Sequence, residues 1–400
     1  MRRFSPEFPW RLDPAVTFVN HGSFGACPLP VLAHQRALID ELEAEPVAFL
    51  DTTIEARIDE ARHAVARFLN ADPDGLVFVQ NATSGVSTVL RSLEFAPGDE
   101  LLTTNHEYNA TLNGLAEIAC RAGARVVIVQ LPLEITSDEE VLEAFLAALT
   151  PRTRLALVSH ITSPTATVLP IERIVRELDE RGVDTLVDAA HAPGQVPVDL
   201  EALSAAYWTG NGHKWLCGPK GSGVLYVRAD RRAMIRPLVI SHGWNDPREE
   251  RPRLWKEFDW TGTPDPTPFL TLPIAITTMR GLHSQGWPGV MAANHELAME
   301  GRTLIADALG VTTHIPEAMH GSMAIIPLPM ASTDDAARAL KLALANEDRI
   351  EVPITPFPVP AARVEPSDPP SAVVVRTSAQ RYNEIDDYAR LAEALSRRLG

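Results

Sequence analysis

Short apolar runs alternate with amphipathic helical patterns between residues 76 and 187. A parallel strand buried on both faces is a nearly continuous apolar run, whereas a surface helix repeats its apolar residues every three or four positions. The alternation is typical of βαβ units and predicts an α/β fold with a mostly parallel sheet covered by helices on both faces. The predicted strands are 76–79, 100–103, 125–129, 155–159 and 185–187, and the intervening helices lie around 86–93, 112–121, 139–149 and 171–180.

The remainder of the chain departs from this alternation and divides the sequence into three units. Residues 1–30 are rich in proline, glycine and aromatic residues and are expected to form an extended N-terminal arm. Residues 31–285 are expected to form a large domain, and 286–400 a small α+β C-terminal domain. We expect a long functional loop at 241–267, a proline-rich link at 353–370, further helices at 53–69, 269–282, 290–309, 333–346 and 386–399, and strands at 323–326 and 373–376.

Composition narrows the function classes and the compartment. The formal net charge of −16 over 400 residues argues against sequence-independent nucleic-acid binding, which needs a basic face. No apolar run approaches the ~20 residues that cross a bilayer, and the basic N-terminus lacks the apolar core of a signal peptide. Cys27, Cys120 and Cys217 lie far apart without a CxxC pair, which indicates a reducing compartment and no metal site. We therefore expect a cytoplasmic protein that binds neither membranes nor nucleic acid.

A lysine stands in a glycine-rich connection between two apolar runs, 203–209 and 224–227, that we expect to extend the sheet. The string is Gly-Asn-Gly-His-Lys-Trp-Leu, with the lysine at position 214. Glycines allow a backbone to approach a ligand, and a desolvated lysine loses basicity and becomes a nucleophile. Lys214 has the surroundings of a Schiff-base lysine. The alternative is an exposed turn lysine, and these residues alone leave both interpretations open.

Two further strings follow predicted strands and offer polar groups to the same edge of the sheet. Gln-Asn-Ala-Thr-Ser-Gly-Val, at 80–86, opens a helix whose N-terminal amides can bind an anion, although for such a string alone a simple N-cap at Thr83 or Ser84 is the commoner explanation. The chain has no G-x-G-x-x-G or Walker motif. Asp188 ends a buried strand, where a carboxylate can hold a protonated ring nitrogen while His191 reaches a neighbouring oxygen. Its alternative role is to cap the following turn.

Aromatic and cationic candidates occur in two other places. The string Thr-Thr-Asn-His-Glu-Tyr-Asn-Ala, at 103–110, offers the rings of His106 and Tyr108 for stacking, or forms a solvated loop. Arg376 ends an apolar strand, where a bidentate clamp for a carboxylate would fit. A structural salt bridge is its alternative.

Taken together, these strings resemble the fold-type I pyridoxal-phosphate enzymes of the class V aminotransferase family, which includes cysteine desulfurases, and within it the isopenicillin N epimerase-like proteins. The resemblance covers nearly the whole chain, and its motifs occur in family order and at family-like spacing. It implies the fold-type I transferase architecture and pyridoxal 5′-phosphate as cofactor. The motifs are Asn-His-Gly-Ser-Phe-Gly, Asn-Ala-Thr-Ser, His-Glu-Tyr, Ser-His-Ile-Thr-Ser-Pro-Thr, Asp-Ala-Ala-His-Ala-Pro-Gly, Gly-Asn-Gly-His-Lys-Trp, Thr-Gly-Thr-Pro-Asp and Arg-Thr-Ser-Ala-Gln-Arg-Tyr-Asn.

The resemblance also implies roles for individual residues. Lys214 matches the lysine that binds the cofactor and shuttles the substrate's α-proton, and Asp188 matches the carboxylate that keeps the pyridine nitrogen protonated. Arg376 matches the residue that grips the substrate carboxylate, with Asn20 and His21 on the substrate side. The remaining implied cofactor contacts are His191 at the phenolic oxygen, Tyr108 (or else His106) stacked on the ring, Ser163, and Ala82, Thr83 and His213 at the phosphate. Thr263 matches a residue that reaches the phosphate of a neighbouring subunit, which implies a homodimer.

The reaction is left open by these motifs. The closest resemblance favours epimerisation of an amino acid through a quinonoid, with a C–S β-lyase or desulfhydrase, or an aminotransferase, as alternatives. A non-catalytic cofactor-binding regulator is a remote further possibility. Persulfide-forming desulfuration is not expected, since residues 354–370 lack the cysteine that desulfurases carry there, and Cys217 lies in a different stretch. Asn211 stands where desulfurases usually carry a hydroxyl, which leaves a phosphate contact from that position open. The aromatic residues of the 241–267 loop are assigned either to the substrate pocket or to a dimer interface: His242, Trp244, Trp255 and Trp260.

Overall fold

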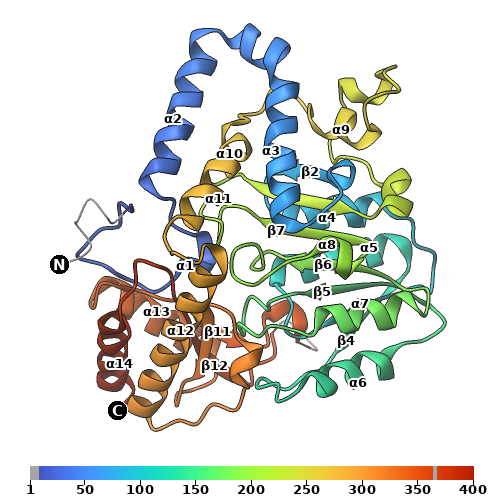
Figure 1. Ribbon diagram of the computed structural model, residues 1–400. Coiled ribbons are helices and arrows are strands. Elements are labelled where there is room, and N and C mark those ends of the chain that lie inside the picture. The colour runs from blue at the N-terminus through green and yellow to red at the C-terminus, as the bar shows by residue number, and fades with distance from the viewer. Residues whose placement is uncertain (1–8, 364–366) are drawn as a thin grey trace.

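The computed structural model describes residues 9–363 and 367–400, and seven strands of this part form one sheet in the order β2-β8-β7-β6-β5-β3-β4 (Figure 1). The strand pairs from β7 to β4 are parallel, and β8 runs antiparallel to both of its neighbours. The prediction of an α/β fold with a mostly parallel sheet is therefore confirmed. The strands are β2 (Leu76–Val79), β3 (Glu100–Thr104), β4 (Arg125–Val129), β5 (Thr153–Ser159), β6 (Asp184–Ala189), β7 (Tyr207–Asn211) and β8 (Gly223–Val227).

Both faces of the central strands of this sheet are buried, which explains why those strands contain long apolar runs. Side chains alternate across a strand, so Leu155 and Leu157 of β5 join the apolar cluster on one face and Ala156 and Val158 join the cluster on the other. Helices cover each face (Figure 1). The helices on and beside the sheet are α2 (Leu29–Ala44), α3 (Ile54–Leu69), α4 (Ala82–Ser92), α5 (Asn109–Ala122), α6 (Asp138–Ala148), α7 (Ile171–Asp179), α8 (Leu200–Leu203), α10 (Thr267–Leu270) and α11 (Leu272–Arg280).

A second, antiparallel sheet of the described part has the strand order β11-β12-β9 and packs against helices in a core of its own. The strand β11 lies in the stretch for which we predicted only a proline-rich link, and residues 364–366 of that link lie outside the described residues. The proposed boundaries after residues 30 and 285 stay a prediction. The elements of this region are α12 (Trp287–Leu309), β9 (Met323–Pro327), α13 (Asp334–Asn346), β10 (Ile350–Glu351), β11 (Ile354–Phe357), β12 (Ala372–Ser378) and α14 (Ile385–Leu399).

The N-terminal segment joins the two regions. Strand β1 (Thr17–Phe18) pairs with β10, and the short helix α1 (His21–Phe24) then brings the chain to the turn that holds Lys214. Residues 1–8 of the predicted extended arm lie outside the described residues. No helix in the described ranges is long and apolar enough to cross a membrane.

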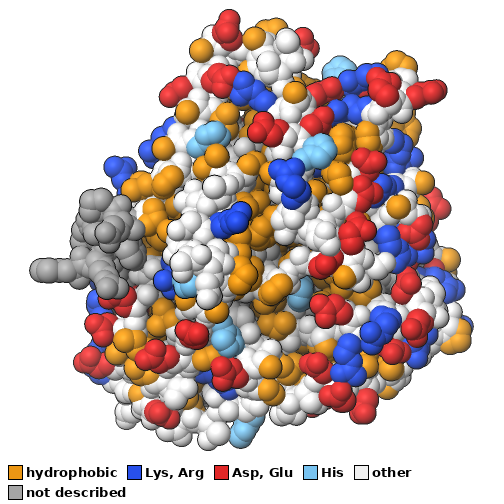
Figure 2. Space-filling view, viewed as in Figure 1, with side chains coloured by type: hydrophobic (Ala, Val, Ile, Leu, Met, Phe, Trp, Pro, Cys, Tyr) orange, Lys and Arg blue, Asp and Glu red, His pale blue; other side chains and the backbone are white. Residues whose placement is uncertain are grey.

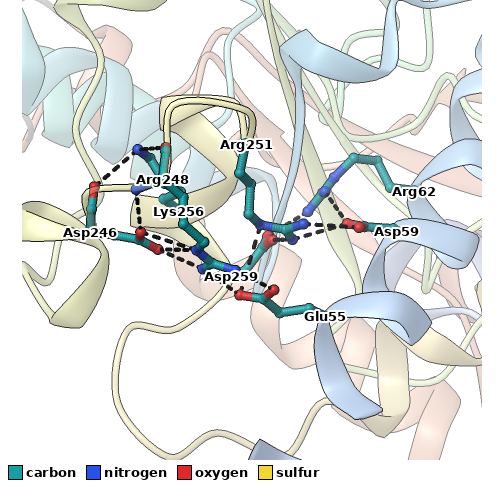
Figure 3. Close-up of polar contacts among 8 residues, drawn as sticks. All are labelled: Glu55, Asp59, Arg62, Asp246, Arg248, Arg251, Lys256 and Asp259. Carbon is teal, nitrogen blue, oxygen red and sulfur yellow. Dashed lines mark hydrogen bonds and ion pairs between the residues drawn. The ribbon is translucent and has the colours of Figure 1, made fainter. Parts of the chain in front are cut away.

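The segment predicted as a long loop, 241–267, contains the helix α9 (Arg253–Phe258) and is held to α3 by a network of ion pairs (Figure 3). Arg62 of α3 has a fully buried side chain and pairs with Asp59 and Asp259. Arg251 pairs with the same two carboxylates. The guanidinium of Arg62 also lies 4.0 Å from the centre of the Trp255 ring, a cation–π contact. The position of this segment is therefore fixed by ion pairs between residues nearly 200 positions apart in the sequence, and not by local secondary-structure propensity.

We expect the substitution Arg62→Met to lower the free energy of unfolding by about 3 kcal/mol, because a buried carboxylate then loses one of its cations. Burial raises the pKa of Asp259 and the positive charge of Arg62 opposes that rise. The loss should be largest where Asp259 is ionised and should shrink as the pH falls and the carboxylate takes up a proton. Urea unfolding at several pH values measures both effects.

The matched control for Arg62→Met in this ion-pair network is Arg248→Met. Arg248 pairs with Glu55 and Asp246 but is 41% exposed. An exposed pair contributes about 0–1 kcal/mol. Equal destabilisation by the two substitutions would contradict the assignment of Arg62 as the buried anchor.

Candidate active site

A cavity of about 510 Å³ lies where the parallel strands of the large sheet end and the second sheet approaches. The carboxyl ends of parallel strands are the usual ligand-binding edge of an open α/β sheet. Residues from segments far apart in sequence line the cavity: 22–24, 80–83, 108–109, 159–164, 188–191, 211–214, 220–221, 353–359 and 376.

Lys214 projects into this cavity from the turn that follows β7. Its Nζ lies 3.0 Å from Nε2 of His191. Burial and the positive charge of Arg376 lower the pKa of Lys214 to about 7, while the charge of Asp188 opposes the shift. Near neutral pH a substantial fraction of this amine is therefore uncharged, the form that acts as nucleophile or base. The alternative of an exposed turn lysine does not fit these surroundings.

The glycines around Lys214 make room for protein rather than for a ligand. A Cβ on Gly212 would lie 2.6 Å from Leu272 of α11. A Cβ on Gly25, whose φ is +70°, would lie 2.4 Å from the carbonyl oxygen of His213. From the sequence we expected these glycines to let the backbone approach a ligand. In the structure they instead let α11 and the N-terminal segment pack against the turn that holds Lys214.

Asp188 is held at the end of β6 by two hydrogen bonds. Its Oδ1 accepts from the backbone N–H of Ala190 at 3.0 Å, and its Oδ2 accepts from the hydroxyl of Thr111 at 3.1 Å. Burial raises the pKa of Asp188, while the N–H of Ala190 and the charge of Lys214 hold it down. The bond to Ala190 is the turn cap that we considered as an alternative, yet the carboxylate also faces the cavity.

A second carboxyl group lies behind Asp188. Glu107 is fully buried and accepts hydrogen bonds from the N–H and the hydroxyl of Ser159, which pairs with Asp188 across β5 and β6. Burial, together with the negative charge of Asp188, raises the pKa of Glu107 to about 8. Glu107 therefore carries a proton at neutral pH, and the negative charge of the pair resides on Asp188.

The N-terminal turn of α4 forms one end of the cavity. Asn81 caps the helix by accepting from the N–H of Ser84 at 2.9 Å, and Asn211 accepts from the N–H of Ala82 at 2.9 Å. Thr83 is exposed to the cavity. The N-cap is thus Asn81, not Thr83 or Ser84. Because Asn81 and Asn211 engage the N–H groups of Ser84 and Ala82, the N–H and hydroxyl of Thr83 are the groups of this turn that face the cavity for an anion. Asn211, whose contact the sequence left in doubt, supports this turn.

Arg376 of β12 faces the cavity from the second sheet. It donates from Nη1 to the backbone carbonyl and hydroxyl of Ser163, and from Nη2 to the hydroxyl of Ser23 at 3.2 Å. Within the described residues it has no carboxylate partner, and its buried Nε has no partner at all. Burial lowers the pKa of Arg376 to about 10, so it remains a cation at pH 7. The geometry contradicts a structural salt bridge and suits a site for a ligand carboxylate.

Four other residues predicted from the sequence also line the cavity: His191, Ser163, His213 and Tyr108. His191 is buried beside Lys214, and Ser163 lies 3.4 Å from its Nε2. Burial and the charge of Lys214 lower the pKa of His213 to about 4, and the same two causes lower that of His191 well below its usual value. Both histidines are neutral at pH 7. Tyr108, which precedes α5, exposes 46% of its surface at the cavity mouth.

Several candidates lie elsewhere. His106 does not line the cavity, which Tyr108 does, and contacts the Thr165 hydroxyl and the carbonyl of Pro132 instead. Asn20 and His21 do not line the cavity, although their neighbours Gly22, Ser23 and Phe24 do. His21 instead lies 3.0 Å from the carbonyl oxygen of Lys214 and supports the turn. Likewise absent from the cavity lining are Thr263, His242, Trp244, Trp255 and Trp260.

The sequence analysis missed three supporting residues. Thr111 binds Asp188, Glu107 binds Ser159, and Lys220 donates to the carbonyl of Gly25 at 2.7 Å. Thr111 lies three residues after Tyr108, one helical turn, and that spacing was the available signal. The other two contacts join distant segments and left no local pattern.

The cavity residues fit pyridoxal 5′-phosphate. The α4 turn suits a phosphate, the buried carboxylate of Asp188 suits a protonated pyridine nitrogen, and the amine of Lys214 suits an aldehyde. No group of three or more histidine, cysteine, aspartate or glutamate side chains that could hold a metal ion occurs in the ranges that the structure describes.

Comparison with known proteins agrees with this fit. A family model described as aminotransferase class-V matches residues 29–387. An isopenicillin N epimerase of Amycolatopsis lactamdurans is 35% identical over 398 residues, which cover 96% of this chain and 95% of that protein. An L-cysteine desulfhydrase of Arabidopsis thaliana is 29% identical over 403 residues, 95% of this chain and 87% of that protein.

A solved structure gives the same fold. A C-DES variant with glycine covalently linked to its pyridoxal phosphate cofactor matches with a TM-score of 0.77 at 22% identity, covering 95% of this chain and 96% of that chain. The likeness confirms the fold-type I architecture predicted from the motifs.

Proposed function

Since the chain belongs to the class V aminotransferase family, we propose that it is a pyridoxal-phosphate-dependent enzyme that inverts the α-carbon of an amino acid. The observation that carries the proposal is the convergence of three groups on one cavity: the amine of Lys214 with its lowered pKa, the carboxylate of Asp188 and the guanidinium of Arg376, which has no carboxylate partner within the described residues. An amine, a carboxylate and a cation in this arrangement suit removal of the α-proton from an amino acid whose carboxylate is fixed.

Each of these residues has a defined task in the proposed reaction. When bound, the cofactor withdraws electrons from the α-carbon and so acidifies its hydrogen. Arg376 binds the substrate carboxylate, and neutral Lys214 accepts the α-proton. Asp188, fixed by Thr111 and Ala190, keeps a proton on the ring nitrogen. His191 stays neutral beside Lys214 and hydrogen-bonds with its amine, which keeps Nζ within the cavity.

Epimerisation is the first choice among reactions that share this first step. The isopenicillin N epimerase of Amycolatopsis lactamdurans is similar over almost its full length. The alternative is C–S β-elimination, supported by the similarity to an L-cysteine desulfhydrase. Desulfuration through an enzyme persulfide is not supported, because residues 354–370 contain no cysteine and Cys217 is buried behind the lysine turn.

A substrate panel distinguishes the two reactions. The wild-type protein, loaded with cofactor, is incubated separately with isopenicillin N, L- and D-methionine, L- and D-cysteine and S-methyl-L-cysteine. Chiral chromatography measures inversion, and assays for pyruvate and thiol measure elimination. We expect inversion of at least one compound without pyruvate. Rapid release of pyruvate and thiol, with no inversion of any compound, would reject the epimerase in favour of the lyase.

We further propose that the active unit is a homodimer. Thr263 is exposed and lies on a cavity of about 910 Å³ away from Lys214, with α3 on its other wall. Ile39, within α2, and Val47, beyond its C-terminal end, are exposed apolar residues. Figure 2 shows apolar side chains interspersed over the face that carries α2, α3 and α11. A position outside its own active site suits a threonine that contacts the phosphate held by a second copy.

A further inference from the structure

Inversion at an α-carbon needs a proton donor on the side of the substrate opposite the group that removes the proton. Lys214 supplies one side only. This requirement rests on the proposed epimerase function. The donor is expected among the other acidic and basic groups that line the cavity.

Most of those groups lie on the Lys214 side or are already engaged. His191 is in contact with Lys214 itself, and His213 is the neighbour of Lys214 in sequence and donates from Nδ1 to the carbonyl of Ser222. Lys220 is bound to the carbonyl of Gly25. Asp188 is held at the position assigned to the ring nitrogen. None of these four is placed to deliver a proton to the opposite side.

Tyr108 is placed there. It precedes α5, directly after β3, whereas Lys214 follows β7, and the strands β5 and β6 lie between β3 and β7 in the sheet. One turn further along α5, Thr111 reaches back to bond Asp188. Tyr108 and Lys214 therefore flank the position of Asp188 from its two sides, and both line the cavity.

The phenol of Tyr108 is chemically free to act. Within the described part of the chain its hydroxyl makes no hydrogen bond, unlike the buried hydroxyl of Tyr388, which donates to the carbonyl of Ser378. Tyr108 is 46% exposed, so water can exchange protons with it. It also lies near Arg376, the cation assigned to the substrate carboxylate, and both residues line the cavity.

We propose that Tyr108 is the second acid–base residue of the epimerase, acting on the face of the α-carbon opposite Lys214. In one direction Lys214 takes the α-proton and becomes an ammonium ion, and the Tyr108 hydroxyl gives its proton to the α-carbon from the other side and becomes a phenolate. Solvent then returns one proton to Tyr108 and removes one from Lys214, so no oxidant or co-reactant is needed. In the other direction the two residues exchange roles.

The test is Tyr108→Phe, which removes one hydroxyl and keeps the ring. The probes are the two epimers of whichever panel compound the wild-type protein inverts, incubated in D₂O. We expect inversion to fall by about 100-fold or more in both directions, the usual contribution of a general acid–base group. Proton NMR should show that exchange of the α-hydrogen continues within about threefold for the epimer whose hydrogen faces Lys214, and falls for the other epimer. Fluorescence titration should give an unchanged Kd for the cofactor.

A purely stacking role predicts a different pattern. Tyr108→Ala removes the ring as well, and should weaken cofactor binding as well as inversion. If Tyr108→Phe inverts the probe at the wild-type rate, or loses exchange at both epimers together with cofactor affinity, Tyr108 is not the second acid–base residue although the epimerase stands. If the wild-type protein inverts no compound and releases pyruvate, the epimerase itself is rejected, and this inference with it.

Discussion

Replacement of Lys214 by alanine is expected to lower turnover by at least about 10⁴-fold while the cofactor still binds. Alanine removes the amine that both attaches the cofactor and accepts the α-proton. The other cofactor contacts remain, since Asp188 and the α4 turn are fixed by Thr111, Ala190, Asn81 and Asn211. Borohydride reduction followed by peptide mass spectrometry should attach the cofactor to the 210–216 peptide of the wild-type protein and leave the variant unlabelled.

Lys214→Arg separates the charge of this residue from its chemistry. Arginine keeps a cation in the cavity but stays protonated at every accessible pH, so it cannot serve as nucleophile or base. It should therefore lose turnover nearly as completely as alanine. Full activity of Lys214→Ala would refute the role of the lysine, and substantial activity of Lys214→Arg would show that only its charge matters.

The sequence predicted the large sheet well because its physical cause is local. A strand buried on both faces must be apolar at nearly every position, and β5 places Leu155 and Leu157 on one face and Ala156 and Val158 on the other. The helix α9 was missed for the opposite reason. Its segment is fixed by ion pairs of Arg62 and Arg251 with residues distant in sequence. The spacing of hydrophobic residues along the chain does not indicate such pairs.

The residues of the candidate active site also fall into those that the sequence could indicate and those that depend on contacts between distant segments. Lys214, Asp188 and Arg376 were recognisable as reactive types at the ends of apolar runs, yet each had a structural alternative that only the fold could decide. For Arg376, the structural salt bridge was ruled out because the guanidinium has no carboxylate partner within the described residues. His106 lies outside the cavity and contacts Thr165 and Pro132, and its sequence string did not reveal these contacts.

Asp188→Asn is expected to lower turnover by about 10²–10³-fold, the usual effect of removing one preorganised electrostatic contact from an active site. Asparagine has nearly the same shape and can still accept from the N–H of Ala190. It lacks the negative charge that holds a proton on the ring nitrogen, so the cofactor withdraws electrons less strongly. Steady-state kinetics should place the loss in kcat, and the cofactor Kd should rise far less than turnover falls.

Glu107→Gln is the matched control, because Glu107 is a buried carboxyl group next to Asp188 with a pKa raised to about 8. At pH 7 the wild-type side chain is already protonated, and glutamine resembles that neutral acid, so turnover should fall less than about tenfold. Above pH 8 the wild-type Glu107 loses its proton and adds a second negative charge beside Asp188, a change that the variant cannot make. The kcat profiles of the two proteins should therefore diverge only above that pH. Equal losses for Asp188→Asn and Glu107→Gln at pH 7 would mean that the two carboxyl groups share the charge, and that the ring nitrogen is not governed by Asp188 alone.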